Sequence, residues 1–100
     1  MMRWDPTEYD LTVAARLYAR IELGSAEVVT LEGLPLQPRA RAIVNISKTD
    51  LECARTRLAA HPDSLELEHV GRWLDMVESQ LRTVRRGLTA LGPVPIAKSA

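Results

Sequence analysis

The side chains best suited to acid–base or nucleophilic chemistry in this sequence are few and widely separated. The two histidines, His61 and His69, are the side chains that titrate near neutral pH. Neither has a nucleophile at a spacing typical of a catalytic pair. The single thiol, Cys53, precedes His61 by eight residues, about 80° around a continuous helix, so the two would meet only if the chain folded back. We therefore expect that the protein is not an enzyme.

Metal and phosphate sites are not indicated either. One cysteine and two separated histidines form neither a CxxC nor an HxxxH pair, which are typical zinc-ligand spacings. Gly24 and Gly33 lie nine residues apart without the lysine that a Walker motif requires. The sequence thus predicts no metal ion and no other cofactor.

Composition and charge restrict the partners and the cellular compartment that we expect for the chain. Its 100 residues include 13 basic and 13 acidic side chains, so the formal net charge is zero. A balanced charge gives no long-range attraction to nucleic acid or to anionic membranes. No stretch approaches the roughly 20 apolar residues that span a bilayer, and no secretory signal is recognisable. A single cysteine fits a reducing compartment, so we expect a cytoplasmic protein.

The strongest pattern is a heptad repeat in the second half of the chain. Its apolar residues recur at alternating steps of three and four, as in a long α-helix that buries one narrow stripe. We call this stripe the α-helical seam: Leu67, Val70, Leu74, Val77, Leu81, Val84, Leu88 and Leu91. Asp63 with Glu66 forms a capping box before it, and Gly92-Pro93 follows it. Together these features predict a helix over residues 64–91.

A first helix is predicted over residues 6–23. Asp5 has the properties of an N-cap and Pro6 those of a first-turn residue. Gly24 suits a left-handed residue that closes the last turn. Residues 25–37 fit a strand as well as a helical turn, and we favour a short helix or loop there.

A second helix is predicted over residues 38–60, beginning at Pro38. Its apolar and small residues repeat the same spacing, at Ala40, Val44, Ser47, Leu51, Ala54 and Leu58. Alternatively, residues 43–46 form a strand or separate turn that ends at a capping box over residues 49–52. We favour the continuous helix.

These elements predict an all-α fold, a small helical bundle with three main helices, in one domain over residues 1–92. The short link around His61-Pro62-Asp63 predicts that the second and third helices are antiparallel. The tail over residues 93–100 has two prolines and little to bury, so we expect it to be extended or disordered.

The seam is slightly longer than a compact domain of this size. It extends about 37 Å, whereas a compact globule of this size is about 34 Å across. Several residues of the second helix that would face the seam are small, so another helix or chain must supply the remaining apolar volume. We favour the first helix, which completes an internal bundle, over a homo-oligomer contact at the exposed end of the seam.

The outer side of the last helix carries acidic residues first and arginines later, which complements the helix dipole. Three of the arginines share a face that could contact phosphates. However, Glu68 precedes Arg72 by four residues and Glu78 precedes Arg82 by four, and we expect both to be solvated ion pairs. Direct nucleic-acid binding is therefore not expected.

A protein partner fits this helix better than a nucleic acid does. Trp73 flanks the seam, where it covers the core edge or anchors a partner, and we favour the structural role. The acidic residues could imitate the phosphates of a nucleic acid toward a basic protein. The candidate partner-binding side chains are Trp73, Asp75, Glu78, Arg82, Arg85 and Arg86.

In size, charge balance and the capped helices of residues 5–92, the chain resembles small inhibitor proteins of phages and mobile elements, anti-CRISPR proteins included. No family motif accompanies this profile. The resemblance implies a stoichiometric inhibitor that docks on a nucleic-acid-handling host complex, which would be its protein partner, and blocks it. Two alternatives stay open: a DNA-binding helix-turn-helix regulator, and a structural coiled-coil oligomer or adaptor.

Overall fold

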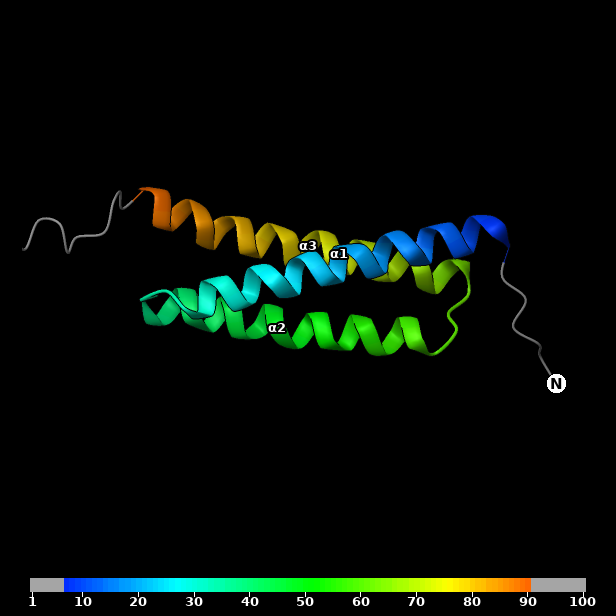
Figure 1. Ribbon diagram of the computed structural model, residues 1–100, viewed down its shortest axis with the longest axis horizontal. Coiled ribbons are helices and arrows are strands. Elements are labelled where there is room, and N and C mark those ends of the chain that lie inside the picture. The colour runs from blue at the N-terminus through cyan, green and yellow to red at the C-terminus, as the bar shows by residue number, and fades with distance from the viewer. Residues whose placement is uncertain (1–6, 91–100) are drawn as a thin grey trace, which may run out of the picture.

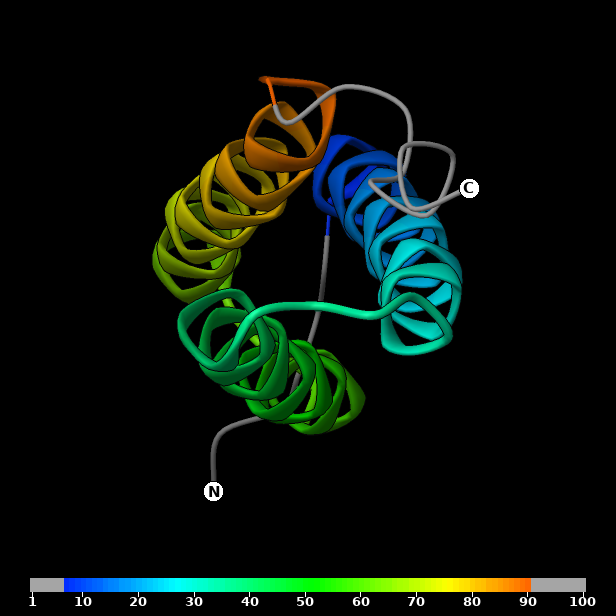
Figure 2. The ribbon, with the colours of Figure 1, turned by 90° about the vertical axis from the view of Figure 1, so that its left-hand side faces the viewer.

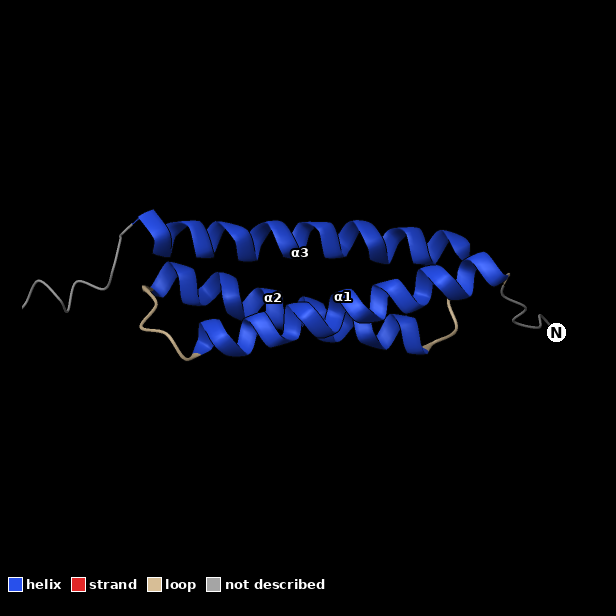
Figure 3. Ribbon diagram, turned by 45° about the horizontal axis from the view of Figure 1, so that its top comes forward, coloured by secondary structure: helices blue, strands red, loops and turns tan. Residues whose placement is uncertain are grey.

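The computed structural model describes residues 7–90, and over this range the chain forms three helices and no strand. α1 spans Glu8–Glu32, α2 spans Pro38–Ala59 and α3 spans Ser64–Ala90. The helices lie side by side, with α2 antiparallel to α1 and α3 (Figure 1). Short loops at opposite ends join them (Figure 3). The predicted all-α bundle of three main helices is confirmed.

The first helix differs from its prediction at both ends. It begins at Glu8 rather than at Pro6, because Thr7 is the N-cap and forms a capping box with Asp10. Asp5, the expected cap, lies outside the described residues. The helix does not end at Gly24 but continues to Glu32, so its predicted end at residue 23 is wrong. Of the short helix or loop expected over residues 25–37, only residues 33–37 form a loop.

Gly24 lies inside α1 because it allows a close approach of α2. A Cβ atom at this position would lie 3.1 Å from Leu51 Cδ2 and 3.3 Å from Leu51 Cδ1. The residue is buried in the middle of a continuing repeat, in which Ile21, Val28 and Leu31 are also buried. The glycine that suggested a helix end is therefore a packing residue.

The core is a single cluster of apolar side chains from all three helices, which form a triangle when viewed end-on (Figure 2). The seam of α3 is buried from Leu67 to Val84, and Leu88 is half-buried against the same cluster. Leu91 lies outside the described residues. The 25 residues of α1 extend about 37 Å and match the seam in length. The expectation that the seam outruns its own domain is wrong, because the bundle is elongated rather than spherical.

The middle helix is continuous, as favoured from the sequence, and no separate turn interrupts it. Thr49 does not cap a new helix, because its hydroxyl donates to the backbone oxygen of Asn45 one turn earlier. The fully buried Ser47 donates to Gln80 Oε1 on α3 at 3.0 Å. This bond satisfies the hydroxyl inside an otherwise apolar seam.

The link between α2 and α3 follows the prediction closely. His61 has a φ of 56°, in the left-handed region, so the chain leaves the right-handed helical conformation at the residue before Pro62. Asp63 Oδ1 accepts a hydrogen bond from the backbone N–H of Glu66 at 2.8 Å. This cap starts α3 and turns it back along α2.

Two alanine substitutions test how closely α1 approaches α2. Alanine stabilises a helix interior by about 1 kcal/mol relative to glycine. A Cβ at Gly71 would lie 3.8 Å from Leu17 Cδ2, an ordinary contact, so Gly71→Ala should raise the free energy of unfolding by up to this amount. In Gly24→Ala, crowding of the new Cβ atom against Leu51 should cancel this gain in the free energy of unfolding. Urea denaturation followed by circular dichroism compares the two variants, and equal stabilisation would contradict the close packing of Gly24.

Candidate interaction surfaces

The residues that could do chemistry are spread over the outside of the bundle. Cys53 and His69 are exposed on α2 and α3, and His61 is exposed in the loop between them. Within residues 7–90, no group of three or more His, Cys, Asp or Glu side chains is placed to hold a metal ion. Every buried side-chain nitrogen or oxygen in this range has a hydrogen-bond partner.

The acidic residues of α3 are held by an arginine from α1. Arg20 donates from Nε and Nη2 to Glu78 at 2.9 Å each, and from Nη2 to Asp75 at 2.6 Å. The hydrogen bond with Glu78 is the largest cause that raises the pKa of Arg20, and it outweighs the opposing effect of partial burial. Asp75 and Glu78, both predicted to bind a partner, thus fasten α1 to α3.

Other ion pairs connect the remaining helix edges. Arg85 Nε donates to Glu27 Oε2 on α1 at 2.7 Å. Lys48 of α2 lies 3.2 Å from Glu32 of α1. The pairs Arg55 with Glu22 and Arg57 with Glu66 link α2 to α1 and to α3. Every pair of helices is therefore bridged by charges that flank the core.

Trp73 occupies the core edge, as favoured from the sequence. It is half-buried and packs against the apolar cluster. The guanidinium carbon of Arg57 lies 5.4 Å from the centre of its ring, within the range of a cation–π contact. The tryptophan and the arginine together close the α2–α3 edge.

The two ion pairs expected within α3 have different outcomes. Arg72 Nη2 lies 2.5 Å from Glu68 Oε1, which confirms the first. The second is wrong, because Glu78 pairs with Arg20 of α1 instead of Arg82. Arg82 and Arg86 are exposed and form no ion pair within the described range. No motif or spacing points to Arg20 and Glu27 as bridging residues, although both flank the buried positions of α1.

An acidic side chain connects the amino ends of α1 and α3. Asp10 is only 8% exposed, and its Oδ1 accepts a hydrogen bond from Ser64 Oγ at 2.7 Å. Its Oδ2 accepts from the backbone N–H of Thr7 at 3.3 Å. The bond from Ser64 is the largest cause that lowers the pKa of the Asp10 carboxyl. The two helix starts are thus joined through one carboxylate.

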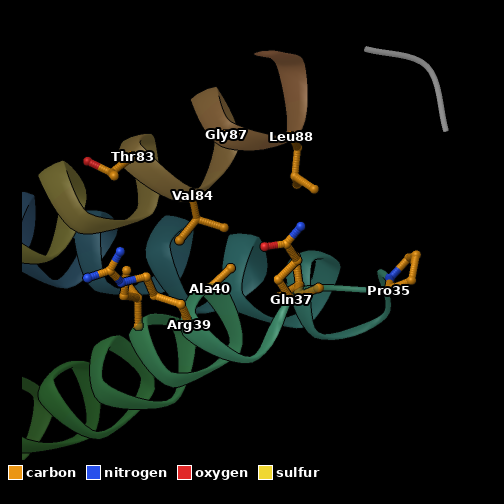
Figure 4. Close-up of a pocket in the computed structure, with 10 residues that line it drawn as sticks. Pro35, Gln37, Arg39, Ala40, Thr83, Val84, Gly87 and Leu88 are labelled. Atoms are coloured by element: carbon orange, nitrogen blue, oxygen red, sulfur yellow. The ribbon is translucent and has the colours of Figure 1, made fainter. Parts of the chain in front are cut away.

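An apolar groove lies between the amino end of α2 and the carboxyl end of α3 (Figure 4). Its volume is about 190 Å³. Val84 and Leu88 line it from α3, and Ala40 and Ile43 line it from α2. Among the described residues, no atom lies within 4 Å of the position that a Cβ atom would take at Gly87, so the wall of the groove that these residues form is open there. Pro35, Leu36, Gln37, Arg39 and Thr83 complete the lining.

A second groove, of about 330 Å³, lies between α1 and the end of α2. Leu11 and Tyr18 line it from α1, and Leu58 lines it from α2. Asp10 also borders it, but the hydrogen bonds with Ser64 and Thr7 already engage both of its carboxylate oxygens. We regard this groove as part of the α1–α2 junction.

Comparisons with protein-family models, with curated proteins and with solved structures find no match to this chain. No helix within residues 7–90 has both the length and the apolar character needed to cross a membrane.

A double-mutant cycle tests the bridge between α1 and α3. Arg20→Gln and Glu78→Gln, alone and together, should give a coupling free energy of about 0.5–1 kcal/mol, because Arg20 is largely covered and makes two bonds to one carboxylate. The exposed pair Glu68–Arg72 is the matched control, with about 0.3–0.5 kcal/mol expected. Urea denaturation measures both cycles. A coupling at Arg20 no larger than that of the control would refute its role as a bridge.

The Asp10 carboxylate predicts a pH dependence of stability. Because the pKa of Asp10 is lower in the folded chain, its charge favours folding at pH values above the unfolded value of about 3.9. That contribution is lost as the pH falls through the folded pKa. Asp10→Asn should therefore be less stable than the wild type at neutral pH, and the difference should shrink in acid. Urea midpoints at a series of pH values test this, and a difference independent of pH would exclude the carboxylate as the cause.

Proposed function

We propose that the chain is a non-enzymatic interaction module that binds a protein partner through the groove between α2 and α3. The single observation that carries this proposal is the open wall at Gly87 beside half-buried apolar residues. The groove has the size of one or two side chains and a largely apolar lining, as expected of a small anchor site in a protein interface.

The glycine at position 87 supports a binding role for the groove. A glycine inside a helix costs about 1 kcal/mol relative to alanine. At Gly24 this cost accompanies a close packing contact with Leu51, whereas at Gly87 a Cβ atom would touch none of the residues that the structure describes. Its backbone is not in the left-handed region either. What the missing side chain provides is space in the groove.

The charges near the groove suggest the chemistry of the partner. Arg39 lines it, and Arg86 is exposed on the turn of α3 that carries Gly87. Neither arginine forms an ion pair with another residue of the described range. A partner that fits would insert an apolar side chain and place a carboxylate beside it.

Such a module acts on its partner by covering a surface. In line with the resemblance to small inhibitor proteins, we propose that the partner is a protein of a nucleic-acid-handling host complex. Binding would block that complex in a one-to-one manner, because the chain contributes affinity and bulk rather than a reaction.

The arrangement of α2 and α3 favours this function over a helix-turn-helix regulator. In a helix-turn-helix the two helices cross at about 90–120° so that the second enters the major groove. Here α2 and α3 lie antiparallel along their whole length, and α3 buries its seam (Figure 1). Arg85, one of the arginines considered for phosphate contact, pairs with Glu27.

Filling the groove tests the proposal. Gly87→Leu places a side chain in the open wall and should weaken partner binding at least about tenfold. Met76→Ser, on an exposed position of α3 away from the groove, is the matched control. Affinity capture from a host lysate with mass spectrometry compares the two with the wild type, and circular dichroism verifies that each variant is folded.

The expected result is one protein complex retained by the wild type and by Met76→Ser but lost with Gly87→Leu. Adding the purified chain to that complex should inhibit its activity on nucleic acid, with saturation at about one equivalent. Equal retention by Gly87→Leu would refute the groove as the binding site. Recovery of nucleic acid alone, without a protein, would refute the interaction module.

A further inference from the structure

The groove between α2 and α3 lies close to the point where the chain leaves the last helix. Val84, Gly87 and Leu88 line it from α3, which ends at Ala90, so they lie about 3–9 Å from that end along the helix axis. Leu88 and Ile43 are only half-buried there, although both pack against the core. Residues 7–90 thus leave an apolar surface partly uncovered beside the end of α3.

The sequence that follows α3 combines apolar residues with prolines. Residues 91–100 lie outside the described residues and read Leu-Gly-Pro-Val-Pro-Ile-Ala-Lys-Ser-Ala. Pro93 and Pro95 each disfavour helical backbone at the residue before them. Val94 and Ile96 alternate with the prolines, and residues two apart in an extended chain face the same side. An extended segment would therefore present two apolar side chains together.

The length of this segment matches the position of the groove. An extended chain rises about 3.3 Å per residue and an α-helix about 1.5 Å, so two extended residues cover the length of about 4.4 helical ones. A chain that reverses at Gly92 brings Val94 level with residues 87–88, and Ile96 level with residues 83–84. Glycine suits this reversal because it readily adopts the left-handed backbone with which helices commonly end. All four of these α3 positions line the groove.

We propose that Val94 and Ile96 of this chain insert into the groove and cover it until a protein partner displaces them. Val94 then lies beside Gly87, in the space that a side chain at that position would restrict. The docking does not rest on the proposed function. The displacement does, because it regulates the same site.

The two prolines favour docking in two ways. Their fixed φ reduces the conformational freedom that the segment loses when it becomes ordered. They also lack an N–H, so fewer backbone donors have to leave water when the segment enters an apolar groove. The composition of the segment therefore lowers the cost of docking.

The charges near the groove explain how a partner replaces the segment. Residues 91–100 contain no Asp or Glu, and their one charged side chain is Lys98. Arg39 and Arg86 therefore gain no side-chain carboxylate when the segment docks. A partner that carries a carboxylate beside its apolar anchor gains both contacts. The docked segment thus lowers the apparent affinity for every partner and favours one that is acidic.

Disulfide cross-linking of the full chain tests the docking, with Cys53→Ser so that no other thiol competes. Ile96→Cys keeps a small apolar side chain, and with Thr83→Cys it places two thiols level in the docked segment. Ile96→Cys with Arg82→Cys is the matched control, because Arg82 is exposed on α3 but does not line the groove. A disulfide needs Cα atoms within about 7 Å, so on mild oxidation of dilute protein the first pair should close at least about tenfold faster.

Mass spectrometry without reduction measures the two rates. A segment that does not dock would reach residues 82 and 83 almost equally, because they are neighbours in the chain. Equal rates for the two pairs would therefore overturn the docking.

Partner affinity tests the displacement, measured by surface plasmon resonance on the complex that the wild type captures. Val94→Asn with Ile96→Asn should raise the affinity at least about threefold, because the groove is then covered in a smaller fraction of the molecules. Ala97→Asn with Ser99→Asn, farther along the same segment, is the matched control and should change the affinity less than about twofold.

The outcomes separate the two proposals. Unchanged affinity after Val94→Asn with Ile96→Asn would overturn the displacement. If the wild type captures no protein complex, the proposed function fails and the displacement fails with it, whereas the cross-linking rates still decide the docking.

Discussion

The apolar seam of α3 can be kept from water only if two other helices of similar length cover it. Each fully buried leucine or valine contributes about 1.5–3 kcal/mol relative to an exposed one, so leaving half of the seam uncovered would cost an amount comparable with the whole stability of a small domain. A first helix that ended at residue 23 would leave that half covered by α2 alone. The turns of α1 after Gly24 instead run beside the carboxyl half of α3, where Glu27 meets Arg85.

Burial alone does not determine which helix lies on which side. Three amphipathic helices can be arranged in two ways around a common core, and both bury the same apolar residues. The flanking charges distinguish them, because Arg20 and Glu27 lie on the edge of α1 that faces α3, while Glu32 lies on the edge that faces α2. Exchanging α2 and α3 around α1 would separate all of these pairs, so the ion pairs favour the observed arrangement.

Much of this fold could be predicted from the sequence, since a seven-residue repeat reports directly on one buried face. α3 and the tight link before it follow from spacing and capping, whereas the continuous α2 follows from spacing alone, against the rival capping box over residues 49–52. The length of α1 could not be predicted in the same way, because glycine both ends helices and permits close packing. Only the position of Leu51 against Gly24 distinguishes the two roles. Similarly, Glu78 had a suitable partner within its own helix, and only the three-dimensional arrangement brings Arg20 nearer.

Contacts between the helices occupy most of the candidate surface predicted from the sequence. Of the six side chains proposed from the sequence, Trp73, Asp75, Glu78 and Arg85 contact α1 or α2. Sequence spacing identifies which residues share a helix face, but it does not show which face a neighbouring helix will occupy. The groove at Gly87 forms where the loop between α1 and α2, the start of α2 and the end of α3 meet. No local sequence pattern could therefore predict it.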